Sequence, residues 1–221
     1  IFDLDGTLLS DKSSWRKAHE FFGTEHRGNS ALMRYEKGEI DYIEFMEHDL
    51  GVWPKGISKK VFDAIFRDYD LSPGAEQTIS GLKSRKVKTA VISSGIDILA
   101  EVVCERLGIG GCMANGFEFN GEGRLTGKGI SRVDPYRKDA VLRSLLEYQS
   151  ASPEETMGVG DTRFDVKFLE ACKYRVAFRP KREDSEILAN IVHYMIDDLR
   201  EILVIIDSVN STEAEISGRK K

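Results

Sequence analysis

From residue 71 onward, apolar segments rich in β-branched residues alternate with amphipathic segments, and this alternation constrains the fold more than any other feature. Strands are expected at residues 87–92, 156–159 and 175–178, and helices at residues 75–86, 138–148 and 164–172. Residues 1–4 have the character of a further buried strand. Strands that alternate with helices form a parallel sheet whose two faces are both covered. The sequence therefore predicts an α/β fold with a Rossmann-like parallel sheet and helices on both faces.

Residues 10–70 interrupt this pattern, because they contain several amphipathic helices and no convincing strand. These helices are expected at residues 15–22, 31–36, 42–50 and 61–69, and the last of them has a clear apolar face at helical spacing. We therefore predict a core of residues 1–9 and 71–206. A small helical cap of residues 10–70 is inserted after the first strand, and residues 207–221 form a polar tail. Between the helices of the core, a short strand is expected at residues 112–115, and Asn120-Gly121 predicts a hairpin turn.

Composition excludes several classes of protein. The 221 residues carry a net charge of -5 and show no basic stripe, which argues against a nucleic-acid partner. No apolar run reaches the ~18 residues of a membrane helix, so no membrane partner is expected. The three cysteines form no CxxC pattern, which argues against a zinc site and favours a reducing, cytoplasmic location. Oligomeric state is not indicated, and native residues are expected before Ile1 because it lies inside a strand pattern.

Two carboxyl groups, Asp3 and Asp5, stand two residues apart at the end of the first apolar strand and precede Gly6. Carboxylates at such a place are costly unless they are paired or hold a metal ion. A site built from oxygen ligands alone suits Mg²⁺, and Gly6 lets the chain turn sharply away. An Asp-Gly turn capped by Thr7 also accounts for the segment when it is taken alone.

A second acidic pair follows the strand expected at residues 156–159. Asp161 comes directly after Gly160, and Asp165 follows four residues later. Aspartate is favoured at the start of a helix, so either residue is also a candidate helix cap. In open parallel sheets, however, ligands bind beyond the carboxyl ends of the strands. Both acidic pairs are expected at that edge, and together they favour a metal site.

Ser93, Ser94 and Gly95 likewise lie between an expected strand and an expected helix. Hydroxyl groups and free backbone N–H groups at a helix start bind anions, although such serines also act as helix caps. Lys138 opens the helix that precedes Asp161, and lysine binds phosphate as a point charge. These residues predict a phosphate-binding site beside the metal site.

The four groups of residues, in this order, resemble the four motifs of the haloacid dehalogenase superfamily, and most closely its phosphoserine-phosphatase-like branch. The resemblance covers nearly the whole chain outside residues 10–70 and implies that this segment is a mobile cap. It implies a Mg²⁺-dependent phosphatase that forms a covalent aspartyl-phosphate on Asp3. The segment from Asn120-Gly121 to Thr126-Gly127 also resembles a hairpin of phosphoserine phosphatases.

The resemblance also implies a role for each matched residue. The catalytic residues are Asp3, which attacks phosphorus, Asp5, which is general acid and then base, and Lys138, which steadies the charge. The metal ligands are Asp3, Asp5 through its carbonyl, Asp161 and Asp165, the last of which holds metal-bound water or the lysine. The phosphate-binding group consists of Ser93, Ser94, Gly95 and Thr7, of which Thr7 supports the loop.

Departures from the branch concern the substrate. In an ungapped alignment from Asp3, Lys12 replaces the acid and Asp49 replaces the arginine with which phosphoserine phosphatases bind the serine amine and carboxylate. The charges are reversed, so phosphoserine would meet like charges at both ends. We therefore expect a different small phosphorylated metabolite. Trp15, Arg16, Arg34 and Trp53 are further candidates to face it, although packing within the cap is the alternative for both tryptophans.

Two other functions remain open. A phosphotransferase or phosphomutase would use the same aspartyl-phosphate and pass the phosphoryl group to a sugar instead of water. A binding module would keep the fold without catalysis, and a broken motif would be its expected sign. Asp3, Asp5, Lys138 and Asp161 are all intact.

Overall fold

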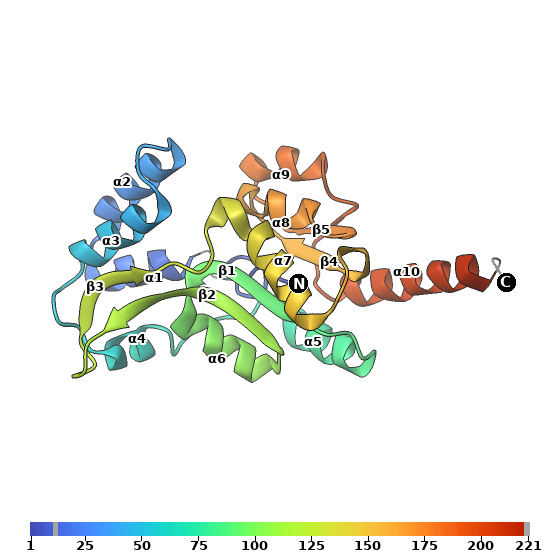
Figure 1. Ribbon diagram of the computed structural model, residues 1–221, viewed down its shortest axis with the longest axis horizontal. Coiled ribbons are helices and arrows are strands. Elements are labelled where there is room, and N and C mark those ends of the chain that lie inside the picture. The colour runs from blue at the N-terminus through green and yellow to red at the C-terminus, as the bar shows by residue number, and fades with distance from the viewer. Residues whose placement is uncertain (11–12, 219–221) are drawn as a thin grey trace.

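The computed structural model describes residues 1–10 and 13–218, with side chains described up to residue 212. Its central sheet is parallel (Figure 1). The strands are β1 (Ala90–Ile96), β2 (Gly111–Phe119), β4 (Met157–Gly160), β5 (Tyr174–Phe178) and β6 (Tyr194–Ile196). β1 pairs with β2, and β5 lies between β4 and β6. The predicted parallel sheet is therefore confirmed.

Residues 1–3 join the two halves of this sheet. Phe2 forms parallel bridges with both Val91 and Val159. Its N–H donates to the carbonyl of Ala90 at 2.9 Å, and the N–H of Asp3 donates to the carbonyl of Val159 at 2.9 Å. The strand predicted at residues 1–4 is thus a short central bridge, and Asp3 lies where the chain leaves the sheet.

Helices cover both faces of the sheet. They are α5 (Ala75–Ser84), α6 (Asp97–Leu107), α7 (Lys138–Gln149), α8 (Val166–Glu170), α9 (Arg182–Ala189) and α10 (Glu201–Gly218), with short 3₁₀ turns at Pro135–Arg137, Pro153–Glu155 and Arg163–Asp165. The apolar side chains of α5, α6 and α10 belong to one core, and those of α7, α8 and α9 belong to a second. Successive strand residues alternate between them, since Val91 faces the first core and Ile92 the second.

Residues 207–218, which were predicted as part of a polar tail, belong to α10, and the tail as a separate unit stays a prediction. This helix continues to Gly218 and extends away from the sheet (Figure 1). Asp207 is held by Arg85, whose guanidinium donates to both carboxylate oxygens at 2.7 Å. Hydrophobic periodicity did not indicate a helix beyond residue 205, because residues 207–218 are mostly polar. Residues 219–221 lie outside the described part of the chain, and no helix within that part has the length and apolarity needed to span a membrane.

The segment predicted as a cap contains helices. They are α1 (Ser14–Phe22), α2 (Glu25–Glu36), α3 (Tyr42–Val52) and α4 (Lys59–Ile65). Trp53 lies at their centre, with its ring 5.8 Å from that of Trp15 and 5.6 Å from that of Phe62. These helices lie at one end of the molecule (Figure 1). In this view α2 and α3 lie above the strand pair formed by β2 and β3 (Leu125–Ile130), and α4 lies below it. The boundaries of a cap domain stay a prediction.

Strand β2 is longer than the predicted residues 112–115. Its first part pairs in parallel with β1, and its second part pairs in antiparallel fashion with β3 (Leu125–Ile130). The change of partner explains the extension, because neither part alone covers the nine residues. The hairpin turn predicted at Asn120-Gly121 is present, with the N–H of Asn120 donating to the carbonyl of Arg124 at 2.8 Å. The β2–β3 hairpin extends beyond the parallel sheet, and β3 packs against α3.

Candidate active site

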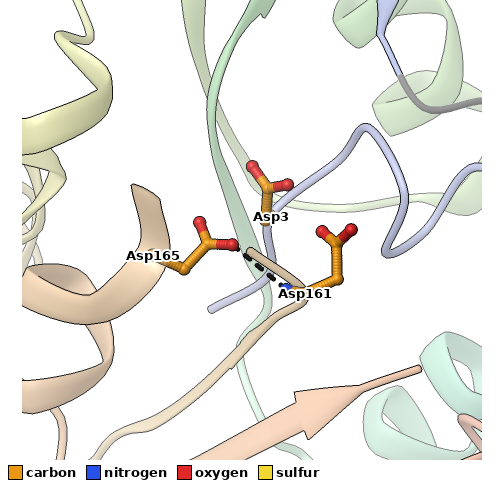
Figure 2. A group of neighbouring side chains, drawn as sticks. All are labelled: Asp3, Asp161 and Asp165. Carbon is orange, nitrogen blue, oxygen red and sulfur yellow. Dashed lines mark hydrogen bonds between the residues drawn. The ribbon is translucent and has the colours of Figure 1, made fainter. Parts of the chain in front are cut away.

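Three carboxylates meet at the carboxyl edge of the sheet. Asp3 follows the central bridge, Asp161 follows β4, and Asp165 ends the next 3₁₀ turn. Each contributes an oxygen to a cluster whose atoms lie within 4.8 Å of one another. Figure 2 shows the three side chains rising on the same side of their backbone segments, with the Asp165 carboxylate bonded to the Asp161 N–H. The structure thus brings together three of the four predicted metal-binding aspartates.

Lys138 connects two of these carboxylates. Its ammonium group lies 2.6 Å from Asp3 Oδ1 and 2.6 Å from Asp165 Oδ1, and its side chain is only 2% exposed. Burial alone would lower the pKa of Lys138, but the carboxylates of Asp165 and Asp3 outweigh burial and raise this pKa above the ordinary lysine value. The lysine therefore stays charged, as the partner that two buried carboxylates require.

The remaining negative charge makes the cluster a suitable site for a divalent cation. Burial raises the pKa of Asp3 to about 7 against the opposing effect of Lys138, and Asp165 and Asp5 add to the rise. Burial, followed by the charges of Asp3 and Asp165, also raises the pKa of Asp161 well above its ordinary value. Such shifts mark carboxylates that lack sufficient positive charge. A divalent metal ion fits this set of oxygen ligands, which contains neither histidine nor cysteine.

Asp165 is an organising residue as well as a member of the cluster. Its Oδ1 binds Lys138, and its Oδ2 accepts the N–H groups of Asp161 and Thr162 at 3.1 Å and 3.0 Å.

Thr7 also forms a hydrogen bond to a member of the carboxylate cluster. It was predicted with the phosphate-binding group, but it is fully buried and its hydroxyl donates to Asp161 Oδ1 at 3.1 Å. Thr7 does not line the cavity described below, and its contact with phosphate stays a prediction.

Glycines allow the carboxylates to approach the backbone. A Cβ on Gly6, whose φ is +90°, would overlap the Asp161 carboxylate. A Cβ on Gly160 would lie 2.6 Å from Cγ of Asp165. The sequence indicated Gly6 only as a turn residue. The structure adds that both positions need glycine because an acidic side chain occupies the space of a Cβ.

Ser93, Ser94 and Gly95 lie at the end of β1, facing Asp5. A Cβ on Gly95 would lie 2.6 Å from Asp5 Oδ2 and 3.0 Å from Ser93 Oγ. Ser93 is buried, and the N–H of Gly95 donates to its hydroxyl at 3.0 Å. The predicted strand ended at residue 92, but β1 continues to Ile96, so these residues end the strand instead of following it.

A cavity of about 410 Å³ joins this edge of the sheet to the predicted cap. The predicted site residues that line it are Asp3, Asp5, Ser93, Ser94, Gly95 and Lys138. Trp15 and Arg16 also line it, as two of the four cap candidates. The other two do not line it. Trp53 is packed among aromatic rings, and Arg34 lies 3.7 Å from Glu39 at the surface.

Sequence reasoning missed one polar pair in the cavity wall. His19 is buried, and its Nε2 lies 3.0 Å from Oδ2 of Asp49, which is also buried. The Nδ1 of His19 accepts from the indole N–H of Trp53 at 3.2 Å. No sequence signal indicated this pair, because thirty residues separate the two partners. Lys12, the other residue involved in the predicted charge reversal, lies outside the described residues.

The parallel sheet and the carboxylate cluster at its carboxyl edge together define a hydrolase of the haloacid dehalogenase type. The family model described as haloacid dehalogenase-like hydrolase matches residues 1–173. The chain belongs to this family, so the predicted membership of the haloacid dehalogenase superfamily and the prediction of a hydrolase are confirmed. Its relatives place it with the phosphoserine-phosphatase-like members, as the motifs predicted.

Two curated relatives illustrate this likeness. The chain is 29% identical over 222 residues to a phosphoserine phosphatase of Archaeoglobus fulgidus. This alignment covers 100% of this chain and 61% of that protein. It is also 29% identical over 208 residues to a phosphoserine phosphatase of Methanocaldococcus jannaschii, covering 92% of this chain and 94% of the relative. The chain thus spans less than two thirds of the first relative and nearly all of the second.

Solved structures agree with the fold. A phospho-aspartyl intermediate analogue of phosphoserine phosphatase has a TM-score of 0.76 and 26% identity, covering 92% of this chain and 96% of that one. A hydrolase of the same family from Salmonella enterica has a TM-score of 0.77 at 22% identity, covering 89% of this chain and 65% of that one. The second likeness concerns the fold alone.

Proposed function

We propose that this protein is a Mg²⁺-dependent phosphatase that hydrolyses a small phosphate monoester through a covalent aspartyl-phosphate on Asp3. The observation that carries the proposal is the position of Lys138, buried between Asp3 and Asp165 at the edge of a cavity. A lysine in this place holds the nucleophile and offers positive charge to a phosphoryl group. Phosphoryl transfer depends mostly on such positioning and charge neutralisation.

In the first half-reaction, a carboxylate oxygen of Asp3 attacks phosphorus in line with the ester oxygen. The bond between phosphorus and the ester oxygen breaks, and Asp5 gives its proton to the departing oxygen. The alcohol leaves, and Asp3 carries the phosphoryl group as an acyl phosphate. In this proposal the Ser93 hydroxyl donates to a phosphoryl oxygen, because the N–H groups of Gly95 and Ile96 are already bonded to the hydroxyls of Ser93 and Ser14.

In the second half-reaction, Asp5 takes a proton from water, and the water oxygen bonds to phosphorus. The bond between phosphorus and the Asp3 oxygen breaks, which releases inorganic phosphate and restores both aspartates. Mg²⁺, when bound by Asp3, Asp161 and the carbonyl of Asp5, supplies positive charge that offsets the charge of the phosphoryl oxygens. Asp165 orients Lys138 throughout.

The cavity wall supports a proposal about the substrate. Beyond the phosphate site the wall includes aromatic side chains from the predicted cap, among them Trp15, Tyr42 and Phe45, together with charged side chains and the buried Asp49. A substrate carboxylate reaching this wall would lie near the Asp49 carboxylate, which favours its rejection. We therefore propose that phosphoserine is a poor substrate. The cytoplasmic location and the small-metabolite substrate remain parts of this proposal.

The test is hydrolysis of 4-nitrophenyl phosphate with Mg²⁺, with a chelator, and with the Asp3→Asn variant. Asp63→Asn is the matched control, because Asp63 is exposed on α4 and outside the cavity wall. Activity is expected to need both Mg²⁺ and Asp3, and acid-quenched protein is expected to carry radiolabelled phosphate only when Asp3 is present. Wild-type turnover by Asp3→Asn would contradict the proposed nucleophile.

Two further measurements separate the alternatives. Phosphate release equal to nitrophenol release, without an added acceptor, identifies a phosphatase, whereas a requirement for a sugar acceptor identifies a phosphotransferase. A panel of phosphorylated metabolites that includes phosphoserine tests the substrate class. Phosphoserine as the preferred member of that panel would overturn the substrate part of the proposal and leave the chemistry intact.

A further inference from the structure

Ser14, at the first turn of α1, contacts the proposed acid–base residue directly. Its hydroxyl donates to Asp5 Oδ2 at 2.8 Å, and its backbone N–H donates to the same oxygen at 2.9 Å. The hydroxyl oxygen also accepts the N–H of Ile96 at 2.9 Å. Ser14 is completely buried. One side chain thus connects Asp5, the start of α1 and the end of β1.

Helix capping does not explain this hydroxyl. The cap of α1 is Ser13, whose side chain accepts the N–H of Arg16 at 3.2 Å. Ser14 is the first helical residue, and its hydroxyl turns away from the helix toward Asp5. A buried serine that donates to a carboxylate and accepts a backbone N–H is fully bonded, so its orientation is fixed.

The same point is crowded from the side of β1. A Cβ on Gly95 would lie 2.6 Å from both Asp5 Oδ2 and Ser14 Oγ, and 3.0 Å from Ser93 Oγ. Asp5, Ser14 and Ser93 therefore converge on one small volume, although they come from three different segments. The carboxylate of Asp5, the proposed acid, and the hydroxyl of Ser93, which is proposed to bind phosphate, therefore both lie next to Gly95 and close to Ser14.

A second set of bonds fixes the neighbouring loop to the same helices. The carbonyl of Ser94 accepts the indole N–H of Trp15 at 3.1 Å, the hydroxyl of Tyr42 at 2.8 Å and the amide of Asn115 at 2.9 Å. Trp15 follows Ser14 directly in α1. Ser14 therefore bonds to Asp5, and the next residue, Trp15, bonds to the phosphate-binding segment. These bonds fix the position of Asp5 relative to that segment.

We infer that Ser14 is a positioning residue that orients the Asp5 carboxyl group for proton transfer to the leaving oxygen. The inference rests on the proposed function, because Asp5 must be the general acid. Without the hydroxyl, Asp5 keeps only the backbone N–H of Ser14 on Oδ2 and gains rotational freedom. Proton transfer depends on such orientation, and general acid catalysis contributes about 10²–10⁴-fold to rate.

The test compares aryl phosphates of similar shape whose leaving phenols differ in acidity, 4-nitrophenyl phosphate and 4-methylphenyl phosphate. An acidic phenol departs with little help from an acid, whereas a less acidic phenol needs the proton. For Ser14→Ala we expect kcat/KM to fall on the order of tenfold or more for the 4-methylphenyl ester and at most about threefold for the 4-nitrophenyl ester. The ratio of the two losses is the readout that a merely structural role would not change.

Three variants complete the design. Ser14→Thr keeps the hydroxyl and is expected to restore the wild-type ratio, whereas Ser14→Cys keeps the shape with a weak donor and is expected to resemble Ser14→Ala. Ser14→Cys also serves if Ser14→Ala fails to fold. Ser144→Ala, an exposed serine on α7 remote from the cavity, is expected to leave both rates unchanged.

The outcomes separate this inference from the proposed function. Equal losses on both esters, no loss, or no recovery with Ser14→Thr would overturn the role of Ser14. If Asp3→Asn remains active, the proposed function itself fails and Ser14 has no acid to orient. If Asp3→Asn is inactive and Asp5→Asn shows the unequal losses while Ser14→Ala does not, only the inference about Ser14 fails.

Discussion

The ammonium group of Lys138 lies 2.6 Å from an oxygen of Asp165, and the other oxygen of that carboxylate accepts the N–H groups of Asp161 and Thr162. Both carboxylate oxygens of Asp165 therefore form hydrogen bonds, and the residue has no exposed surface. The lysine that contacts the proposed nucleophile is held by a residue that is itself fixed to the loop after β4. This relationship makes the lysine and the acidic cluster a single unit.

Removal of the lysine charge is expected to damage both stability and activity. Lys138→Met leaves buried carboxylates without their cation, and breaking a buried ion pair in this way costs about 3–5 kcal/mol. Chemical denaturation of the metal-free protein measures this loss, and turnover is expected to fall below detection. Lys138→Arg is not expected to restore activity, because the larger planar group does not fit a point-charge site. Lys167→Met, on the exposed face of α8, is the control, and a similar loss in it would count against this explanation.

The metal-free protein is expected to lose stability as pH rises toward 8. Burial raises the pKa of Asp3 from 3.8 to about 7. A carboxyl group with a raised pKa in the folded state contributes its stability fully below the unfolded pKa, and this contribution disappears as pH rises through the folded pKa. The window for Asp3 therefore runs from about pH 4 to somewhat above pH 7, and the raised pKa of Asp161 acts in the same direction.

Magnesium is expected to reverse this effect, because the cation replaces the protons that the carboxylates would otherwise hold. The rise in melting temperature caused by saturating Mg²⁺ should be larger at about pH 8 than at about pH 6. Mg²⁺ affinity should increase by up to about tenfold per pH unit below pH 7 for each proton displaced. Thermal melts and calorimetric titration at both pH values measure this, and a stabilisation independent of pH would refute the assignment of these carboxylates as ligands.

Gly6→Ala is expected to lower activity on the order of 100-fold, because the new Cβ would displace the Asp161 carboxylate from the cluster. Gly38→Ala is a matched control. Gly38 also has a positive φ, of 69°, but its Cβ would meet no atom within 4 Å. Both variants carry the backbone strain of alanine in this region, so kinetic assays of the pair isolate the contact with Asp161. Equal activity in the two variants would show that this contact is unimportant.

Gly28→Ala is expected to destabilise the protein by about 1–3 kcal/mol, because a Cβ would lie 2.6 Å from Nε2 of His19 and push the ring from Asp49. Gly51→Ala, in α3, is the matched control, since a Cβ there meets no atom within 4 Å. A helical glycine replaced by alanine in open space is expected to stabilise by roughly 0.5–1 kcal/mol. Denaturant titrations of both variants are expected to give changes of opposite sign, and a stable Gly28→Ala would show that α2 adjusts freely.

The parallel sheet was predictable because β1, β4, β5 and β6 are short apolar segments that are each followed by a helix. The acidic cluster was predictable for the same reason, since the carboxyl ends of parallel strands must meet at one edge. Thr7 was assigned to the phosphate because its place in the motif does not reveal which way its hydroxyl points. Its bond to Asp161 joins residues 154 positions apart, and no local pattern encodes such a contact.

Other features depended on tertiary contacts that carry no sequence period. Ser14 directly precedes the helix expected at residues 15–22 and belongs to none of the motifs, and its hydrogen bonds to Asp5 and to Ile96 of β1 appear only in the folded structure. His19 and Asp49 pair across two helices, and neither stands in a recognisable spacing with the other. The outer turns of α10 contain few apolar residues, so hydrophobic periodicity had no means of detecting them.

The central place of Phe2 in the sheet has a consequence for biosynthesis. Its two neighbours, Val91 and Val159, are translated long after it. At about 5–20 residues per second, roughly 8–30 s pass before the ribosome has made the second neighbour. Until then the segment that carries Asp3 lacks one of its two pairing partners, and Lys138 and Asp161 have no complete sheet edge on which to gather. The proposed site therefore cannot assemble on the nascent chain before the segment that contains Val159 and Asp161 has been synthesised.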